Sequence, residues 1–290
     1  MLIESLPFKL WLLSRAERAG IHIQSMKRCR PVDARRHRGN PLELSYRYPG
    51  RNLLLEAPTE WGFGLFNVCN RRRFLNGVMQ QAFDHPGQER DLLREALRDF
   101  YTDWQPANAA EFLNIPPAEA GELIALPPWQ APWPWDTRNF AEKKDKRERT
   151  ELRENTRILG RRLGIDAGWK CCGPVSDDKL EIEVERLTHV LESVRRQGIC
   201  RHDGNDGDIR ADVLTRPDGC WRWLVHGGQH RYAVISALGN SRITIRAESF
   251  IRREDVSLWP PVIAGVFTPE LALKIFDDHF TQHDSNTSLK

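Results

Sequence analysis

Residues 221–239 read WRWLVHGGQHRYAVISALG, and this stretch decides the fold of the second half of the chain. Its first five residues are the apolar and aromatic run of a strand, and a glycine pair follows shortly afterwards. Residues 232–238 then have the composition of a helix, which Gly239 ends. Residues 243–245 are β-branched and predict the next strand. The sequence therefore predicts a strand–loop–helix–strand unit within residues 208–248.

The loop that joins this strand to this helix, residues 226–231, contains residue types that bind anions. Gly227 and Gly228 let the backbone approach a ligand closely and adopt positive φ values. The free N–H groups at the start of the following helix favour a negative charge at the same place. Arg231 can hold a phosphate with a fork of donors, and His230 can donate to an oxyanion or carry a proton near neutral pH. We therefore predict a phosphate-binding loop; the alternative is a tight turn with a surface arginine and a core histidine.

The elements that precede this unit are predicted from their ends. Ser176 and the two aspartates after it suit the start of a helix over residues 179–197, because acidic side chains favour the positive end of the helix dipole. Residues 209–215 predict a strand. A Pro-Asp-Gly turn at 217–219 joins that strand to residues 220–225, so we expect a hairpin.

The first half of the chain is predicted to mix strands and helices. Residues 42–46 alternate between apolar and polar side chains and predict a strand, and the apolar run 52–55 predicts another. Residues 74–83 and 88–104 have the apolar spacing of amphipathic helices.

Three further stretches connect the halves. Asn108 suits the cap of a short helix over 109–113. The proline- and tryptophan-rich residues 126–135 predict extended chain pinned to a domain surface by its tryptophans, the alternative being an aromatic platform for a sugar or a partner. Residues 142–162 are strongly charged with both signs and predict a solvated helix that links two domains. Contact with nucleic acid is the alternative use of that helix.

The composition narrows the class of protein. The chain has 290 residues, of which 29% are charged, and a formal net charge of +3, which by itself does not indicate nucleic-acid binding. Basic runs nevertheless occur at 27–38 and 71–73. No apolar stretch of about 18 residues occurs, and the apolar start at 2–13 lacks the features of a signal peptide, so we expect a cytoplasmic protein without membrane insertion. The six cysteines form no CxxC pair, and no metal site is predicted.

The run GGQHRYA at 227–233 resembles the signature of the ParB/sulfiredoxin-like fold. The helix and strand before it match the order in that family, so the resemblance covers about residues 171–249. Members include chromosome-partitioning CTP switches, sulfiredoxins that use ATP, and kinases that phosphorylate free serine. They share a nucleotide phosphate on this loop. The resemblance therefore implies the following nucleotide-binding residues: Gly227, Gly228, Gln229, His230 and Arg231.

Two departures from the family pattern restrict the expected activity. Sulfiredoxins need a cysteine immediately before the histidine, where this chain has Gln229, so sulfinic-acid repair is not expected. The partitioning proteins have a helix-turn-helix domain after this unit, whereas the tail here predicts one helix over 269–280. A centromere-type DNA-binding protein is therefore not favoured.

A kinase of this kind needs a base that takes the proton of the acceptor and usually a carboxylate for magnesium. Glu181, Glu183 and Glu185 on the preceding helix are candidates, and Glu181 and Glu185 share one face of it. We take Glu181, Glu185 and His230 as the predicted catalytic residues. The alternative is that the glutamates are solvated surface carboxylates.

We therefore predict an α+β protein with a mixed, partly helical N-terminal domain (1–141), a charged helical linker (142–170) and a ParB/sulfiredoxin-like domain with a C-terminal helix (171–290). The leading function is nucleotide binding with ATP- or ADP-dependent phosphoryl transfer to a small hydroxyl compound. The layout also resembles that of bacterial proteins found with surface-polysaccharide genes. The expected cofactor is a nucleoside triphosphate or diphosphate with magnesium. The alternative is a non-catalytic nucleotide sensor that binds a protein or DNA partner through its arginine runs.

Overall fold

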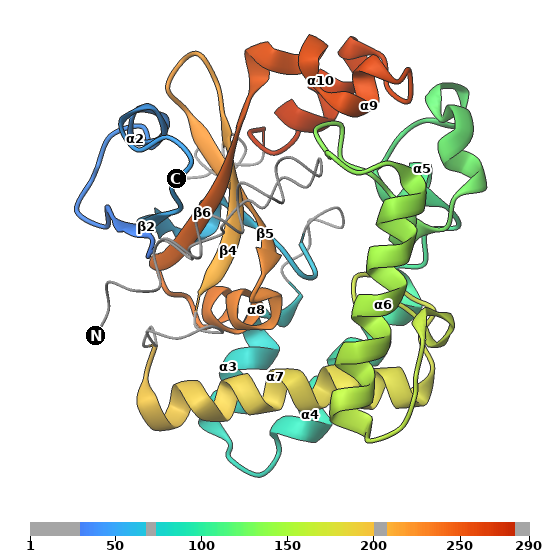
Figure 1. Ribbon diagram of the computed structural model, residues 1–290. Coiled ribbons are helices and arrows are strands. Elements are labelled where there is room, and N and C mark those ends of the chain that lie inside the picture. Colours follow the sequence, from blue (N-terminus) through green and yellow to red (C-terminus); the bar gives the residue numbers. More distant parts are fainter. Residues whose placement is uncertain (1–29, 68–73, 200–207, 282–290) are drawn as a thin grey trace, which may run out of the picture. The chain divides into compact units, whose positions relative to one another are not determined.

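The computed structural model describes residues 30–67, 74–199 and 208–281 (Figure 1). These residues combine helices with a mixed β-sheet, so the predicted α+β class is confirmed at this level. No helix in the described ranges is long and apolar enough to cross a membrane. The predictions for residues 2–13 and 71–73 lie outside the described residues.

The described residues form one six-stranded sheet in the order β1-β2-β6-β4-β5-β3. β4 pairs antiparallel with β5, which confirms the predicted hairpin, and parallel with β6. β2 pairs antiparallel with β6, with Leu53 opposite Ala247. The strands are β1 (Val32–Asp33), β2 (Leu53–Pro58), β3 (Gly62–Phe63), β4 (Ile209–Thr215), β5 (Trp221–Gly227) and β6 (Arg242–Arg252).

The described residues from Val32 onward belong to one compact unit. The pairing of β2 with β6 joins the predicted N-terminal part to the predicted C-terminal part within a single sheet. Local periodicity does not report which strands become neighbours, so this pairing could not be predicted from it. Of the three predicted segments, 1–141 and 171–290 both contribute strands to this sheet, whereas the described residues of 142–170 contribute none.

The helices of the described residues agree well with the predicted ones. Those expected at 74–83, 88–104 and 179–197 are confirmed with small shifts of their ends. The caps are confirmed as well, since Ser176 and Asn108 accept hydrogen bonds from the first turns of their helices. The helices are α2 (Leu42–Arg47), α3 (Leu75–Asp84), α4 (Glu89–Asp103), α5 (Ala109–Phe112), α6 (Phe140–Leu159), α7 (Asp177–Gln197), α8 (Gln229–Ala237), α9 (Pro260–Ile263) and α10 (Pro269–Asp277).

Two local predictions are wrong. Residues 42–46 lie in α2 and not in a strand. Pro41 has the backbone angles that start a helix, and Glu43 and Arg47 complement the helix dipole at its two ends, so these signals outweigh a short alternation. The stretch 126–135 is not extended throughout, because residues 128–130 form a short 3-10 turn.

The tryptophans of that stretch pack as predicted. Trp135 is buried, and its ring is stacked on that of Trp133 with 5.5 Å between centroids. It also meets the rings of Trp259 and Phe276 edge to face. The stretch is thus held against α10 by aromatic packing. The alternative, an aromatic platform for a sugar or a partner, would require Trp135 to be exposed.

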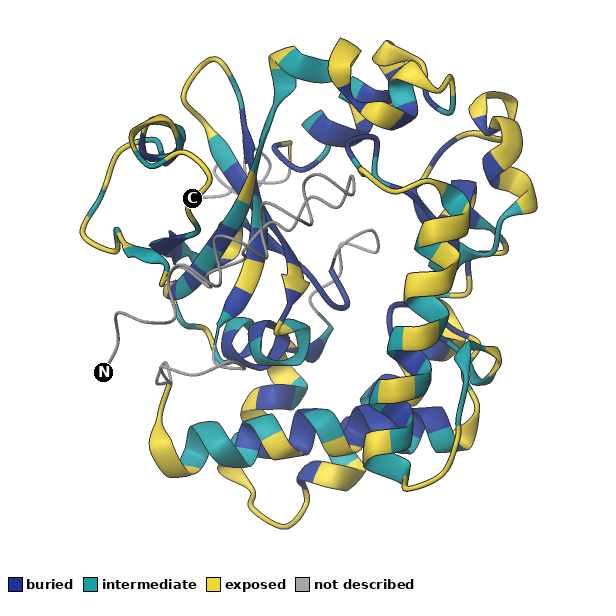
Figure 2. Ribbon diagram, in the orientation of Figure 1, coloured by how far each residue is buried: buried dark blue, intermediate teal, exposed yellow. Residues whose placement is uncertain are grey.

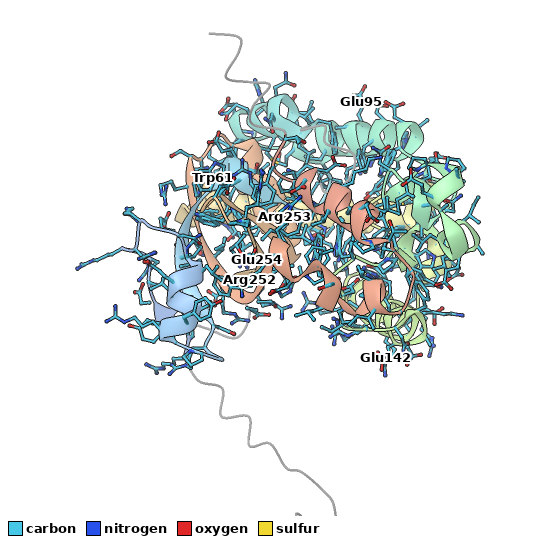
Figure 3. All side chains as sticks on the ribbon, turned by 90° about the horizontal axis from the view of Figure 1, so that it is seen from above. Trp61, Glu95, Glu142, Arg252, Arg253 and Glu254 are labelled. Atoms are coloured by element: carbon cyan, nitrogen blue, oxygen red, sulfur yellow. The ribbon has the colours of Figure 1, made fainter. Side chains whose placement is uncertain are left out.

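The end of β6 is tied to the C-terminal helix by an ion pair. Arg253 donates to Asp277 of α10 over 2.7 Å. The neighbouring Arg252 and Glu254 pair with each other at 2.6 Å (Figure 3). α10 is therefore fixed at one end of the sheet, away from the loop at the end of β5 (Figure 1).

The helices α3, α4, α7 and α8 pack on one another at the other end of the sheet (Figure 1). α7 buries one face, which includes Leu180, Val184, Leu187 and Leu191. In contrast, most of α6 is exposed or half-buried (Figure 2), as its charged composition predicts. Its buried residues are Glu151 and Asn155, and both are polar.

Candidate functional site

The predicted phosphate loop joins β5 to α8. β5 ends at Gly227 and α8 begins at Gln229, so Gly228 is the N-cap of the helix. Gly228 has a φ of 73°, and a Cβ on it would lie 3.2 Å from the carbonyl oxygen of Asp208. A Cβ on Gly227 would lie 2.4 Å from Nε of Arg210. Both glycines therefore allow a close approach that a larger residue would disturb.

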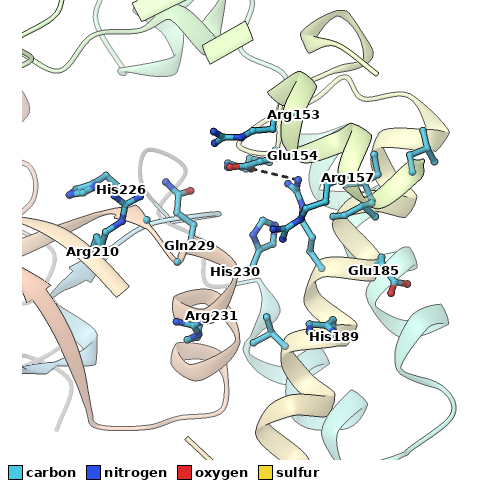
Figure 4. A pocket seen from close by; sticks show the side chains of 18 of the residues that line it. Arg153, Glu154, Arg157, Glu185, His189, Arg210, His226, Gln229, His230 and Arg231 are labelled. Atoms are coloured by element: carbon cyan, nitrogen blue, oxygen red, sulfur yellow. Dashed lines mark ion pairs between the residues drawn. The ribbon is translucent and has the colours of Figure 1, made fainter. Parts of the chain in front are cut away.

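This loop opens into a pocket of about 970 Å³ (Figure 4). The opposite walls come from the second half of α6 and from α7, and the ends of β4, β5 and β6 complete the enclosure. Figure 4 shows Gln229 and His230 in the middle, with two side chains of the sheet on one side and α6 on the other. The labelled side chains are, on the sheet, Arg210 and His226 and, on α6, Arg153, Glu154 and Arg157.

Two arginines of α6 point to anion binding in this pocket. Arg153 and Arg157 are exposed, lie one helical turn apart and both line the pocket. Within the described part of the chain neither makes an ion pair. In contrast, Arg149, one turn earlier, pairs with Asp145 at 3.3 Å. Like charges four residues apart destabilise a helix, so an anion bound between Arg153 and Arg157 would relieve an unfavourable arrangement.

Glu181 and Glu185, two of the predicted catalytic residues, also line the pocket but are engaged elsewhere. Glu181 accepts from Nε of Arg94 at 2.5 Å, and Glu185 accepts from Arg90. The hydrogen bond from Arg94 lowers the pKa of Glu181. A carboxylate with a lowered pKa is a weaker base, and this geometry connects α7 to α4.

The remaining carboxylates of the pocket are paired as well. Glu154 lies 3.5 Å from Lys170 and 3.6 Å from Arg186, and Asp208 lies 3.3 Å from Arg246. Burial acts to raise the pKa of Glu154, but Lys170 and Arg186 outweigh it and lower that pKa. Among the described residues no group of three His, Cys, Asp or Glu side chains is placed to hold a metal ion.

His230 makes a short polar contact with a buried carboxylate. Its Nε2 lies 2.5 Å from Oε2 of Glu183, a fully buried residue of α7. Because an ionised carboxylate can only accept, Nε2 is the donor and Nδ1 is left as the acceptor of the neutral ring. Burial lowers the pKa of His230 and outweighs the opposite effect of Glu183, so the ring is neutral at pH 7. A neutral histidine oriented by a buried carboxylate is suited to accept a proton.

Glu183 is in turn held by a buried lysine. Lys179 has no exposed surface, and its Nζ lies 2.8 Å from Glu183 and 2.9 Å from Glu151. It also donates to Asn155 at 2.9 Å. Burial acts to raise the pKa of Glu183, but Lys179, His230 and Arg186 hold it well below its ordinary value. The charges therefore run continuously from α6 through α7 to the loop histidine.

The structure brings the predicted loop residues together. Gly227, Gly228, Gln229, His230 and Arg231 all line the pocket. Gln229 donates to the carbonyl oxygen of Val225 at 3.2 Å, which ties the start of α8 back to β5. In Figure 4 Arg231 lies on the far side of Gln229 and His230 from Arg153 and Glu154. It therefore lines a different part of the pocket from the arginines of α6.

Sequence reasoning missed the contribution of α6, which it treated as a solvated linker. A signal was present, because arginines recur every fourth residue at 149, 153, 157 and 161. Such a row is unfavourable in an isolated helix unless something compensates it. The preference for Glu181 and Glu185 over Glu183 had a similar cause, since the pattern shows which residues share a face but not which face meets α8.

Comparisons with family models, with curated proteins and with solved structures found no match to this chain. The resemblance to the ParB/sulfiredoxin-like fold therefore stays a prediction. The function has to be argued from the pocket itself.

Proposed function

We propose that the pocket binds the phosphate groups of a nucleotide and that the protein transfers a phosphoryl group to a hydroxyl of a small compound. One observation carries this proposal. The glycine loop and two arginines of α6 that have no ion-pair partner in the described residues line the same pocket. Backbone N–H groups at a helix start and arginine side chains are the usual means by which proteins hold phosphate.

The charge of the pocket supports an anionic ligand. Its lining includes eight lysine or arginine residues and four carboxylates. Each of the four carboxylates is paired, so the uncompensated charge is positive and is concentrated on the α6 side. An excess of positive charge in a concave site raises the local concentration of anions such as nucleotides.

In this proposal His230 is the general base. Glu183 fixes the orientation of the imidazole. Because burial lowers the pKa of the ring, the imidazole is unprotonated at neutral pH and can take a proton. The acceptor hydroxyl gives its proton to His230 while its oxygen attacks the terminal phosphorus. The bond from that phosphorus to the bridging oxygen breaks, and the shortened nucleotide leaves with the electron pair. Arg153 and Arg157 would hold the charge of the transferring group.

A calorimetric titration with ATP, ADP and CTP tests this proposal. We expect at least one of them to bind the wild-type protein and to bind Arg231→Ala more weakly, because that side chain lines the pocket. Arg149→Ala is the matched control, since Arg149 lies on α6 one turn before the pocket. Absence of binding by all three nucleotides would refute the proposal. Binding without turnover for any acceptor would favour the non-catalytic nucleotide sensor.

A further inference from the structure

A second polar cluster lies beside the sheet side of this pocket, which one of its members, His226, lines. Three adjacent strands place His226 (β5), Asp212 (β4) and Glu248 (β6) together. Nε2 of His226 lies 3.4 Å from Glu248 and 3.7 Å from Asp212. The three side chains keep 34%, 23% and 23% of their surface exposed. The cluster thus presents polar atoms to solvent from the middle of a sheet.

The cluster borders the proposed phosphate site. His226 immediately precedes the glycine pair, and both it and Arg210 line the pocket. In Figure 4 these two side chains lie across Gln229 from Arg153 and Glu154. A ligand group on the sheet side would therefore face a phosphate held by the loop and α6.

The members of the cluster do not saturate one another with hydrogen bonds. The distances of 3.4 and 3.7 Å from His226 to the two carboxylates exceed the usual length of a hydrogen bond between nitrogen and oxygen. Because the three side chains stay partly exposed, their polar atoms are available for hydrogen bonds with hydroxyls of a ligand. Burial lowers the pKa of His226 and raises that of Asp212. The neutral imidazole and the nearby carboxylates then offer acceptors to hydroxyl donors.

The charges around the cluster favour a neutral ligand. Glu248 accepts from Arg246 at 2.7 Å and lies 3.9 Å from Arg210. Arg246 also meets Asp208 at 3.3 Å. The two arginines offset most of the carboxylate charge, so neither a free amine nor a further phosphate is strongly attracted. They also add donors, which complement the oxygen atoms of a polyhydroxyl compound.

We propose that His226, Asp212 and Glu248 form a subsite for a neutral polyol or sugar. Its role as the acceptor site for phosphoryl transfer rests on the proposed function, whereas the binding of a polyol does not. In this arrangement Asp212 and Glu248 accept hydrogen bonds from adjacent hydroxyls, and Arg210 covers the same edge of the pocket.

The test uses NMR titration of the histidine side chains with ribitol, glycerol and N-acetylglucosamine as probes. The resonance of His226 is assigned by its loss in His226→Gln. We expect at least one probe to shift this resonance in the wild-type protein. Asp212→Asn should lower the affinity for that probe at least tenfold. The same variant should change the affinity for ATP, ADP or CTP less than twofold. His85→Gln, at the exposed end of α3, should bind the probe as the wild type does.

The two proposals fail differently. If no nucleotide binds but a probe shifts His226, the phosphate proposal is lost and the polyol subsite stands. If nucleotides bind but none of the three probes shifts His226, the subsite is refuted. It is also refuted if Asp212→Asn binds the probe as tightly as the wild type. The wild-type titration does not depend on Asp212→Asn, so a folding defect in that variant does not prevent a decision.

Discussion

Nε2 of His230 lies 2.5 Å from Oε2 of Glu183, and this contact joins the loop at the start of α8 to the buried charges of α7. Glu183 also contacts Lys179 at 2.8 Å, and Lys179 reaches Glu151 on α6 at 2.9 Å. One buried network thus sets the position of α6, which supplies Arg153 and Arg157, and the orientation of the histidine. Both sides of the pocket depend on the same few charges.

Removing the central lysine should destabilise the protein strongly. Lys179→Met leaves Glu151 and Glu183 buried without their shared cation, which costs about 3–5 kcal/mol of the free energy of unfolding. Urea denaturation measures this change. Lys144→Met, at an exposed position of α6, is the control and should alter the same free energy by less than about 0.5 kcal/mol. Equal effects of the two variants would contradict the importance of the network.

Replacing the loop histidine should reduce the rate of phosphoryl transfer more than the affinity for the nucleotide. His230→Gln keeps a donor toward Glu183 but cannot take a proton from an acceptor. We expect kcat to fall by about 10²–10⁴ and the calorimetric affinity for the nucleotide to change far less. His85→Gln serves as the histidine control. A variant with normal kcat would show that His230 is not the base.

Stability should decline in two steps as the pH falls. Burial lowers the pKa of His230 below 6.5, so the unfolded chain binds that proton first and stability decreases below about pH 6.5. Burial acts to raise the pKa of Glu183, but Lys179 outweighs it and that pKa lies well below 4.5, so a second decrease begins below about pH 4.5. Urea denaturation at several pH values measures both steps. His230→Gln should show a smaller loss of stability in the first step. The remaining loss in that step is expected from His226, whose pKa is also lowered by burial.

Two glycines with similar backbone angles allow a matched comparison. Gly228 and Gly239 have φ values of 73° and 76°, but a Cβ on Gly239 would meet no atom within 4 Å. An alanine with such left-handed backbone angles costs about 1–2 kcal/mol at either site. Gly228→Ala should cost more, because its Cβ presses on the carbonyl oxygen of Asp208, and it should also weaken nucleotide binding. Equal losses of melting temperature and unchanged nucleotide affinity, measured by thermal denaturation and calorimetry, would show that the loop tolerates a side chain.

The arginines of α6 should contribute to binding without contributing to stability. Arg153→Ala and Arg157→Ala each remove a charged donor from the pocket, and each should weaken nucleotide binding about tenfold or more. The melting temperature should stay the same or rise, since a repulsion between neighbouring turns is relieved. Arg149→Ala should bind normally. Unchanged affinity in both pocket variants would place the phosphate elsewhere.

Much of the fold could be predicted because local signals agreed with one another. Ser176 marked the start of α7, and the Pro-Asp-Gly turn marked the hairpin of β4 and β5. Residues 42–46 show the limit of this approach, since five alternating residues fit a strand although the flanking charges and Pro41 suit a helix.

The candidate site was predicted in part. The loop was found because glycine, histidine and arginine coincide with a helix start, and all five loop residues line the pocket. Arg153 and Arg157 were not found, because they come from a segment far from the loop in sequence. Glu183 was considered but passed over in favour of Glu181 and Glu185, which share the other side of the helix.

The sequence by itself determined the local conformations: the glycine turn at Gly228, the caps, and the periodic faces of α4 and α7. These depend on backbone sterics and on neighbours within about four residues, so short windows contain the information. Only the tertiary structure decided that β2 pairs with β6 and that Glu183 meets His230. Such contacts are selected by the burial of whole faces and by the need to pair buried charges, which involves segments distant in sequence.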